Sequence, residues 1–193
     1  MANNGNGYDQ RGWVLSALDQ YESRLIRYAA RILGDEDAAR DAVQHAFLRL
    51  CDQDREQLDG RLAPWLYTVC RNKAVDQLRR SGRHESLDGE SLPGSPTRQI
   101  TGRETDPAVA AERRDLAAWL RSLVDALPSK LREVIDLWLD GFSYREIAEI
   151  TSRSDGHIRV MVHRALTRLR EHPQIRELLN EQAIHKTLTR QST

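Results

Sequence analysis

Apolar residues recur at three- and four-residue spacing along most of the chain, as expected for the buried faces of amphipathic helices. Over residues 13–50 this series is interrupted once, at Gly34 and Asp35, which combine a helix stop with an acidic helix start. A further apolar series covers residues 62–78 and ends before a basic, polar run. These patterns predict a bundle of three or four helices over residues 13–80.

The apolar period is lost over residues 81–107 and resumes from Val109. Residues 81–107 are rich in Gly, Ser, Pro and Thr between scattered charges, so they bury too little apolar surface to offset the entropy of ordering and predict a flexible linker. A second helical domain is predicted over residues 108–172, with a C-terminal extension over residues 173–193. Residues 1–12 are polar and Gly/Asn-rich and are predicted to form a disordered tail. The predicted fold is all-α, with two small helical domains joined by a flexible linker.

The second domain carries the signals of a helix-turn-helix. One helix is predicted to end at Gly141, where glycine can adopt the left-handed conformation of a C-cap. The next begins after Ser143, and Glu146 three residues later completes a capping box. A short turn follows, with Ser154 as the N-cap of a third helix predicted from Gly156. This order of helix, tight turn and helix is typical of proteins that bind the DNA major groove.

The third helix has no acidic residue between Gly156 and Arg170, and its apolar positions leave a basic face opposite the core. Arginine can contact guanine with two hydrogen bonds, and arginines near the helix end can neutralise phosphates. The predicted DNA-binding residues are His157, Arg159, Val160, His163, Arg164 and Arg168. The alternative is a solvated basic face on a structural helix.

Composition, charge and the absence of certain motifs from the sequence exclude several classes of protein but do not identify one. The 193 residues are 30% charged and 39% hydrophobic with a formal net charge of +0, so any basic surface must be local. Neither a signal peptide nor an apolar run long enough to span a bilayer is present, which predicts a cytoplasmic protein without membrane insertion. The two cysteines have no partner at metal-ligand spacing, and no nucleophile–base pair or Gly-rich phosphate loop is evident. We expect neither an enzyme nor a metal or cofactor site.

Three segments resemble one protein family. They read EDAARDAVQHAFLRL from Glu36, LAPWLYTVCRNKAVDQLRR from Leu62 and ALPSKLREVIDLWLDGFSYREIAEI from Ala126. Together and in this order they resemble bacterial sigma factors of the extracytoplasmic-function (ECF) type, within the sigma-70 family. The resemblance implies a two-domain specificity subunit of RNA polymerase. Core RNA polymerase and promoter DNA are the expected partners, and it stays open whether an anti-sigma factor also binds.

The resemblance also implies roles for particular residues. In this family the first domain, region 2, docks on the polymerase β′ clamp helices and opens the minus-10 element, while the second, region 4, sits on the β flap and reads the minus-35 element. The third-helix residues named above would then read the minus-35 element. The expected polymerase-binding residues are Arg40, Asp41, Gln44, His45 and Leu48. The expected minus-10 residues are Arg71, Asn72, Lys73, Asp76, Arg79 and Arg80.

The sequence departs from the family pattern in two places. The usual acidic motif Asp-Ala-Glu-Asp reads Ala38-Ala39-Arg40-Asp41, so a cation stands where a carboxylate is common. The usual Gly-Thr-Val of the recognition helix reads Gly156-His157-Ile158, so promoter preference cannot be transferred from a relative.

Two alternative functions stay open. One alternative is a helix-turn-helix repressor or activator that acts without polymerase. The other is an interaction protein that needs no DNA.

Overall fold

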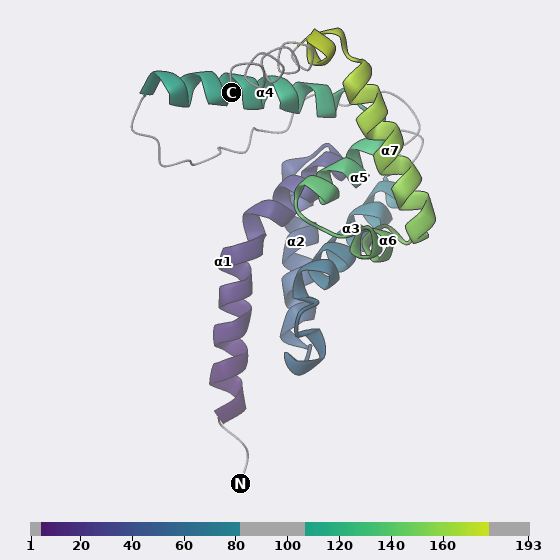
Figure 1. Cartoon of the computed structure of the whole chain (residues 1–193). Coiled ribbons are helices and arrows are strands. Elements are labelled where there is room, and N and C mark those ends of the chain that lie inside the picture. Colours follow the sequence, from purple (N-terminus) through teal and green to yellow (C-terminus); the bar gives the residue numbers. More distant parts are fainter. Residues whose placement is uncertain (1–4, 82–106, 178–193) are drawn as a thin grey trace, which may run out of the picture.

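The computed structural model describes residues 5–81 and 107–177, and all regular structure in these two ranges is helical (Figure 1). Four elements form the N-terminal domain: α1 (Gly5–Leu33), α2 (Glu36–Cys51), the 3₁₀ helix η1 (Glu56–Leu58) and α3 (Leu62–Arg80). Four more form the C-terminal domain: α4 (Pro107–Asp125), α5 (Ser129–Leu139), α6 (Tyr144–Thr151) and α7 (Asp155–Glu171). The prediction of an all-α chain with two helical domains is confirmed.

The N-terminal domain is a bundle in which α1, α2 and α3 pack against one another. Its core contains Leu25, Leu50 and Leu66, one from each helix and each fully buried. Gly34 ends α1 with a φ of 69°, a left-handed conformation that glycine adopts without steric cost. Asp35 then caps α2 by accepting a hydrogen bond from the backbone N–H of Ala38. The predicted break between the first two helices is therefore confirmed.

The start of α1 corrects one prediction. The helix begins at Gly5, so the expected disordered tail over residues 1–12 is wrong for residues 5–12, and residues 1–4 lie outside the described ranges. Gln10 ties this first part of α1 to the turn that follows α2, because its Nε2 donates to the carbonyl oxygen of Gln53 at 2.8 Å. A long-range contact of this kind cannot be read from local composition.

The C-terminal domain contains the predicted helix-turn-helix. Gly141 follows α5 with a φ of 96°. Ser143 and Glu146 form both hydrogen bonds of the capping box at the start of α6, and Ser154 accepts from the backbone N–H of His157 at the start of α7. The turn between α6 and α7 contains Ser152, whose left-handed φ of 54° closes α6. The third helix begins at Asp155, one residue before the predicted start.

Helix α4 extends sideways from the rest of the C-terminal domain (Figure 1). Its Trp119 donates from Nε1 to Oε1 of Gln174, 2.9 Å away, which joins α4 to the segment after α7. The predicted linker, residues 81–107, is bounded in the structure by Ser81 and Pro107, and residues 82–106 lie outside the described part of the chain. Of the predicted C-terminal extension, residues 178–193 also lie outside it.

The two domains pack against each other. Helix α3 of the first domain lies against α6 of the second, and side chains of α1 reach α5 (Figure 1). The sequence predicted two domains and a linker but not this packing. The packing of the two domains determines which parts of the candidate DNA-binding surfaces are exposed.

Candidate nucleic-acid interface

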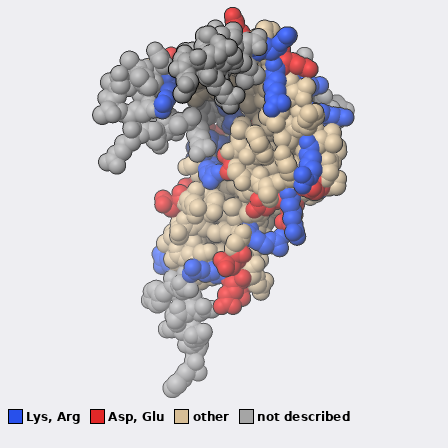
Figure 2. Space-filling view, in the orientation of Figure 1, with Lys and Arg blue, Asp and Glu red and all other residues tan. Residues whose placement is uncertain are grey.

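Helix α7 presents a basic face because its apolar residues are buried on the opposite side. Ile158, Met161, Val162 and Ala165 are buried, and α7 packs on α5 and α6. The six residues predicted to contact DNA are all exposed: His157, Arg159, Val160, His163, Arg164 and Arg168. Figure 2 shows Lys and Arg side chains along the edge of the molecule where α7 lies. The exposed surface expected of a recognition helix is present.

Arg159 is held in place by two neighbours. Its Nε donates to Oδ2 of Asp155 at 2.8 Å, and its guanidinium carbon lies 4.9 Å from the centre of the Tyr144 ring. The hydrogen bond from Arg159 to Asp155 and the charge of that carboxylate raise the pKa of Arg159. Tyr144, the first residue of α6, was not among the predicted site residues. Asp155 could have been found from its position four residues before Arg159, but Tyr144 lies on another helix and gave no comparable signal.

The end of α3 carries most of the residues predicted to bind the minus-10 element. Asn72, Asp76, Arg79 and Arg80 are exposed, and Lys73 is half-buried. Asp76 forms an ion pair with Arg79, one helical turn away, with 3.9 Å between Oδ1 of Asp76 and Nη1 of Arg79. The structure thus places the predicted amide, carboxylate and cations at this end of α3.

A groove separates this surface from the other domain. Four residues of the predicted minus-10 set line it from α3, and the last residue of α6 and its C-cap line it from the other side: Arg71, Asn72, Asp76 and Arg79 with Thr151 and Ser152. The groove therefore lies between the candidate minus-10 surface and the helix-turn-helix.

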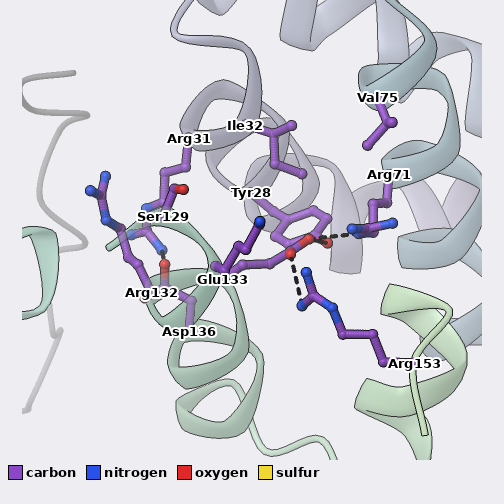
Figure 3. A pocket seen from close by; sticks show the side chains of 11 residues that line it. Tyr28, Arg31, Ile32, Arg71, Val75, Ser129, Arg132, Glu133, Asp136 and Arg153 are labelled. Carbon is purple, nitrogen blue, oxygen red and sulfur yellow. Dashed lines mark hydrogen bonds and ion pairs between the residues drawn. The ribbon is translucent and has the colours of Figure 1, made fainter. Parts of the chain in front are cut away.

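Arg71 is in a different environment from its neighbours on α3. Only 15% of its side chain is exposed, and its Nε donates to Oε1 of Glu133 on α5 at 2.6 Å (Figure 3). Burial alone would lower the pKa of Arg71. The ion pair and hydrogen bond with Glu133 have the opposite effect and outweigh burial, so the pKa is raised. Arg153 also approaches the same carboxylate, at 3.6 Å. In this conformation Arg71 binds the protein's own carboxylate.

Helix α2 presents the residues predicted to face polymerase. Asp41, Gln44 and Leu48 are exposed, Leu48 by 61%, whereas Phe47 is buried. A groove between α1 and α2 has a mainly apolar lining that includes Val14, Leu18, Ile26, Val43, Phe47 and Leu48, together with Arg40 and Gln44. Asp41 and His45 are not among its lining residues, and His45 is half-buried. The structure brings three of the five predicted residues to one groove.

Within the described ranges, no cluster of three metal-ligating side chains occurs. In those same residues no helix combines the length and apolarity needed to cross a bilayer.

These observations define a class: a two-domain helical protein in which one domain is a helix-turn-helix with an exposed basic recognition helix. Comparison with known proteins then identifies the family. Residues 17–84 match the family described as Sigma-70 region 2, and residues 117–169 match Sigma-70, region 4. The two matches coincide with the two domains and occur in the same order.

Curated relatives support the same conclusion. The chain is 29% identical over 167 residues to the ECF RNA polymerase sigma factor SigW of Bacillus subtilis, with 83% of this chain and 88% of SigW covered. It is 31% identical over 156 residues to SigL of Mycobacterium tuberculosis, covering 79% and 84%. Against SigE of Mycolicibacterium smegmatis the identity is 29% over 154 residues, 79% of this chain but 58% of SigE.

The chain belongs to the ECF sigma factors of the sigma-70 family. Such proteins are transcription initiation factors rather than enzymes, and they act with RNA polymerase at specific promoters. Core RNA polymerase and promoter DNA are accordingly the partners of the family, and ECF members often have an anti-sigma factor.

Proposed function

We propose that this sigma factor directs core polymerase through three separate surfaces: α7 for the minus-35 element, the end of α3 for the minus-10 element, and α2 for the polymerase clamp. Linking these surfaces in one chain raises the effective concentration of each contact once another has formed, so that weak individual contacts suffice. The observation that carries the proposal is the exposed basic face of α7, in a domain that matches sigma region 4.

The minus-35 role of α7 follows from its geometry and charge. A helix-turn-helix places its second helix in the major groove, where Arg can read guanine through two donors. Arg164 is exposed in the middle of α7, and Arg168 lies one turn further on. We assign base contact to Arg159, Val160, His163 and Arg164, and phosphate contact to Arg168 and the flanking His157.

The minus-10 role of α3 rests on its mixture of hydrogen-bonding groups. The amide of Asn72 and the carboxylate of Asp76 can bond to base edges, while Arg79, Arg80 and Lys73 can hold phosphates. Asn72, Asp76 and Arg79 line a groove between α3 and the end of α6. A strand of unpaired DNA would lie along this face of α3.

The polymerase role of α2 rests on an apolar groove with a polar rim. Leu48 and the α1 side chains Val14 and Leu18 provide apolar surface that would be removed from water on docking. Asp41, Gln44 and Arg40 provide the charged and polar contacts that fix the register of such an interface. We assign this surface to the β′ clamp helices and the C-terminal domain to the β flap.

Run-off transcription tests the proposal directly. Core RNA polymerase is supplied with the protein and with genomic fragments that include the promoter of its own gene. We expect promoter-specific transcripts that core polymerase alone does not make, and we expect Leu48→Asp to abolish them by blocking docking. A control variant, Leu15→Asp, alters another exposed leucine, which lies outside this groove, and should leave transcription intact. No transcript from any fragment, combined with tight binding of the isolated protein to duplex DNA, would contradict the proposal.

The polymerase-independent repressor or activator is not favoured, because both domains match sigma regions and the relatives are RNA polymerase sigma factors. We further propose that the protein acts in the cytoplasm, where DNA and polymerase are found, and that it has no catalytic activity or cofactor of its own.

A further inference from the structure

Val160 is the one large apolar side chain among the exposed residues of α7, a helix that the structure describes throughout. It is 46% exposed, whereas three other apolar residues in the same half of the helix, Ile158, Met161 and Val162, are buried. A single exposed valine is ordinary on a protein surface. The position of Val160 on the recognition helix makes it different.

Val160 lies in the middle of the face of α7 that points away from the core. Because a helix turns by about 100° per residue, Val160 is displaced by about 100° or more from each buried residue of α7. Its neighbours one turn away on the same face are Gly156, His163 and Arg164, and all three are exposed. His163 and Arg164 are among the residues assigned to base contact, so Val160 lies within that surface.

Two neighbours leave the methyl groups of Val160 accessible. One turn before it, Gly156 has no side chain, and the position that its Cβ atom would occupy is open, with no neighbouring element within 4 Å. Arg159 is held towards other groups, because its Nε donates to Asp155 at 2.8 Å and its guanidinium carbon lies 4.9 Å from the centre of the Tyr144 ring. A flat partner can therefore contact Val160 without displacing Arg159.

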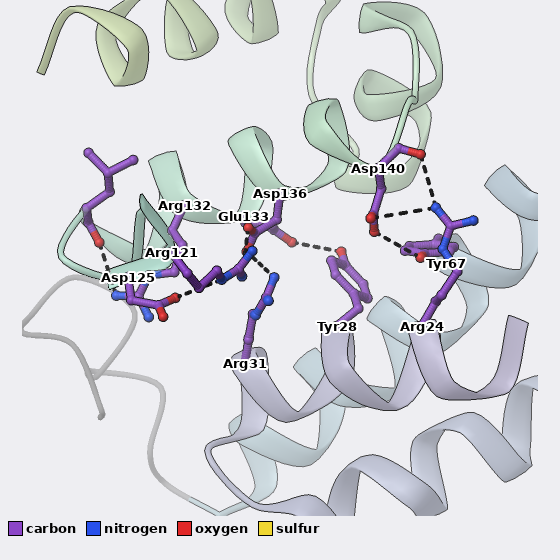
Figure 4. A network of polar contacts seen from close by, with 11 residues as sticks. Arg24, Tyr28, Arg31, Tyr67, Arg121, Asp125, Arg132, Glu133, Asp136 and Asp140 are labelled. Atoms are coloured by element: carbon purple, nitrogen blue, oxygen red, sulfur yellow. Dashed lines mark hydrogen bonds and ion pairs between the residues drawn. The ribbon is translucent and has the colours of Figure 1, made fainter. Parts of the chain in front are cut away.

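The packing of the two domains does not occupy this face of α7. Within the described residues, α7 packs mainly against α5 and α6 of its own domain. Ion pairs that join the domains lie instead along α5, where Asp136 pairs with Arg31 at 2.6 Å (Figure 4). At the end of the same helix, Asp140 pairs with Arg24 at 3.6 Å. Val160 is thus accessible in the domain arrangement that the structure shows.

The DNA major groove offers one apolar group to such a side chain. Base edges in this groove present hydrogen-bond donors and acceptors, and thymine adds a C5-methyl group. The side chain of Val160 can neither donate nor accept a hydrogen bond, so the methyl group is the partner that suits it. A β-branched residue also has essentially one side-chain rotamer in a helix, so little conformational entropy is lost when the contact forms.

We propose that Val160 recognises the C5-methyl group of one thymine in the minus-35 element, while the surrounding His and Arg side chains contact polar base edges and phosphates. This inference rests on the proposed function of α7. It makes one part of the promoter preference a property of this chain's own side chain. No relative is needed to derive it.

Replacement of thymine by uracil tests the contact, because it removes the methyl group and keeps every hydrogen-bonding group of the base pair. A promoter found by run-off transcription is prepared with uracil at each thymine of the minus-35 element in turn, on either strand. Competition binding then measures the affinity of the holoenzyme for each duplex. We expect about fourfold weaker binding at one position, the factor for one buried methyl-sized group.

Val160→Ala links this effect to the side chain. Alanine keeps the helix, since its helix propensity exceeds that of valine, and it removes both γ-methyl groups. The variant should bind the thymine duplex about fourfold more weakly than the original protein, and uracil should weaken its binding no further. Leu15→Ala on α1 shortens another exposed apolar side chain and should retain the full effect of uracil. Circular dichroism melting curves verify that both variants are folded.

Cytosine and 5-methylcytosine separate the methyl group from the rest of thymine. At the position that is sensitive to uracil, these two bases differ from each other in the C5-methyl group alone. The original protein should bind the 5-methylcytosine duplex about fourfold more tightly than the cytosine duplex, whereas Val160→Ala should bind both equally. Equal binding of the two duplexes by the original protein would overturn the inference.

The outcomes also distinguish this inference from the proposed function. The inference is wrong if no uracil substitution weakens binding, or if Val160→Ala remains as sensitive to uracil as the original protein. Promoter-specific transcription in that case would leave the proposed function intact. If the holoenzyme makes no transcript but the isolated protein binds duplex DNA, the proposed function is refuted. The same uracil comparison on that duplex then still tests the role of Val160.

Discussion

Nε of Arg71 on α3 lies 2.6 Å from Oε1 of Glu133 on α5, although 62 positions separate the two residues in the sequence. Their side chains are only 15% and 14% exposed. Two such desolvated charges depend on each other, because removal of either leaves the other without its partner. This ion pair joins α3, the helix assigned to the minus-10 element, to α5, which packs against α7, the helix assigned to the minus-35 element. The two proposed DNA-binding surfaces are therefore joined by a direct contact between α3 and α5.

The capping box of α6 is expected to stabilise the helix-turn-helix. Ser143→Ala removes the side-chain acceptor for the backbone N–H of Glu146 and the hydroxyl that donates to Glu146 Oε2, and should lower the free energy of unfolding by about 1 kcal/mol. Urea denaturation monitored by circular dichroism measures the change. Ser16→Ala on the exposed surface of α1 serves as the control, with an expected effect within about 0.5 kcal/mol. Equal effects of the two substitutions would contradict the role of the cap.

The two cysteines are expected to react at very different rates. Burial raises the pKa of the Cys70 thiol to about 12, so almost no thiolate forms at pH 8, whereas Cys51 is exposed. Iodoacetamide should modify Cys51 and spare Cys70 in the folded protein, and should modify both in urea. Mass spectrometry of the digested protein identifies the modified residue. Rapid modification of Cys70 without denaturant would show that the core of the N-terminal domain opens readily.

Stability is expected to depend on pH through Asp136. Burial raises the pKa of this carboxyl group to about 7, although Arg31 lowers it. Because the unfolded chain has a pKa near 3.9, the folded protein holds a proton that the unfolded chain has lost between these values. The contribution of Asp136 to the free energy of unfolding should therefore fall as pH rises from about 4 to about 7.

Asp136→Asn removes this titration. Urea denaturation at several pH values should show a less negative slope of stability against pH in this variant than in the original protein. The groups that act on Asp136 are Arg31, Asp125, Asp140 and the ion-paired Arg121. The control Asp115→Asn changes an exposed carboxylate and should leave the slope unchanged. An identical slope in all three proteins would rule out Asp136 as the titrating group.

Tyr144 is expected to influence DNA recognition through Arg159. Its ring holds the guanidinium group by a cation–π contact, so Tyr144→Leu should free Arg159 and weaken promoter binding by the holoenzyme by about two- to fivefold. Tyr144→Phe keeps the ring and should retain most of the affinity. Competition binding with labelled promoter fragments compares the two. If both variants lose the same affinity, the hydroxyl group rather than the ring face matters.

Local structure could be predicted from the sequence because its signals are local. Gly34 with Asp35 gave the first helix break, Ser143 with Glu146 gave the start of α6, and Ser154 gave the start of α7. Each signal acts within four residues and needs no knowledge of the rest of the chain. The exposed face of α7 followed for the same reason, since a helical period fixes which residues oppose the buried side.

The packing of the two domains could not be predicted in this way. Arg24, Asp140 and Glu133 each resemble an ordinary solvated charge on a helix, and the sequence contains no signal that pairs them across the intervening linker. The burial of Tyr67 likewise depends on residues far away in the sequence, because its ring contacts Tyr28 and Phe142, which belong to different domains. For Arg71 the sequence suggested only a DNA contact, while the structure shows a carboxylate partner. Long-range charge complementarity becomes visible only in three dimensions.

Footprinting of the holoenzyme on a promoter that supports run-off transcription tests the central claim, that one chain uses two domains at two promoter elements. Protection from DNase I reports upstream contact, and permanganate reactivity of thymines reports opened DNA. Arg164→Ala should lose the upstream protection, whereas Asn72→Ala should keep it and lose the permanganate signal. Loss of both signals to the same degree in both variants, with intact polymerase binding, would contradict the assignment of separate roles to α7 and α3.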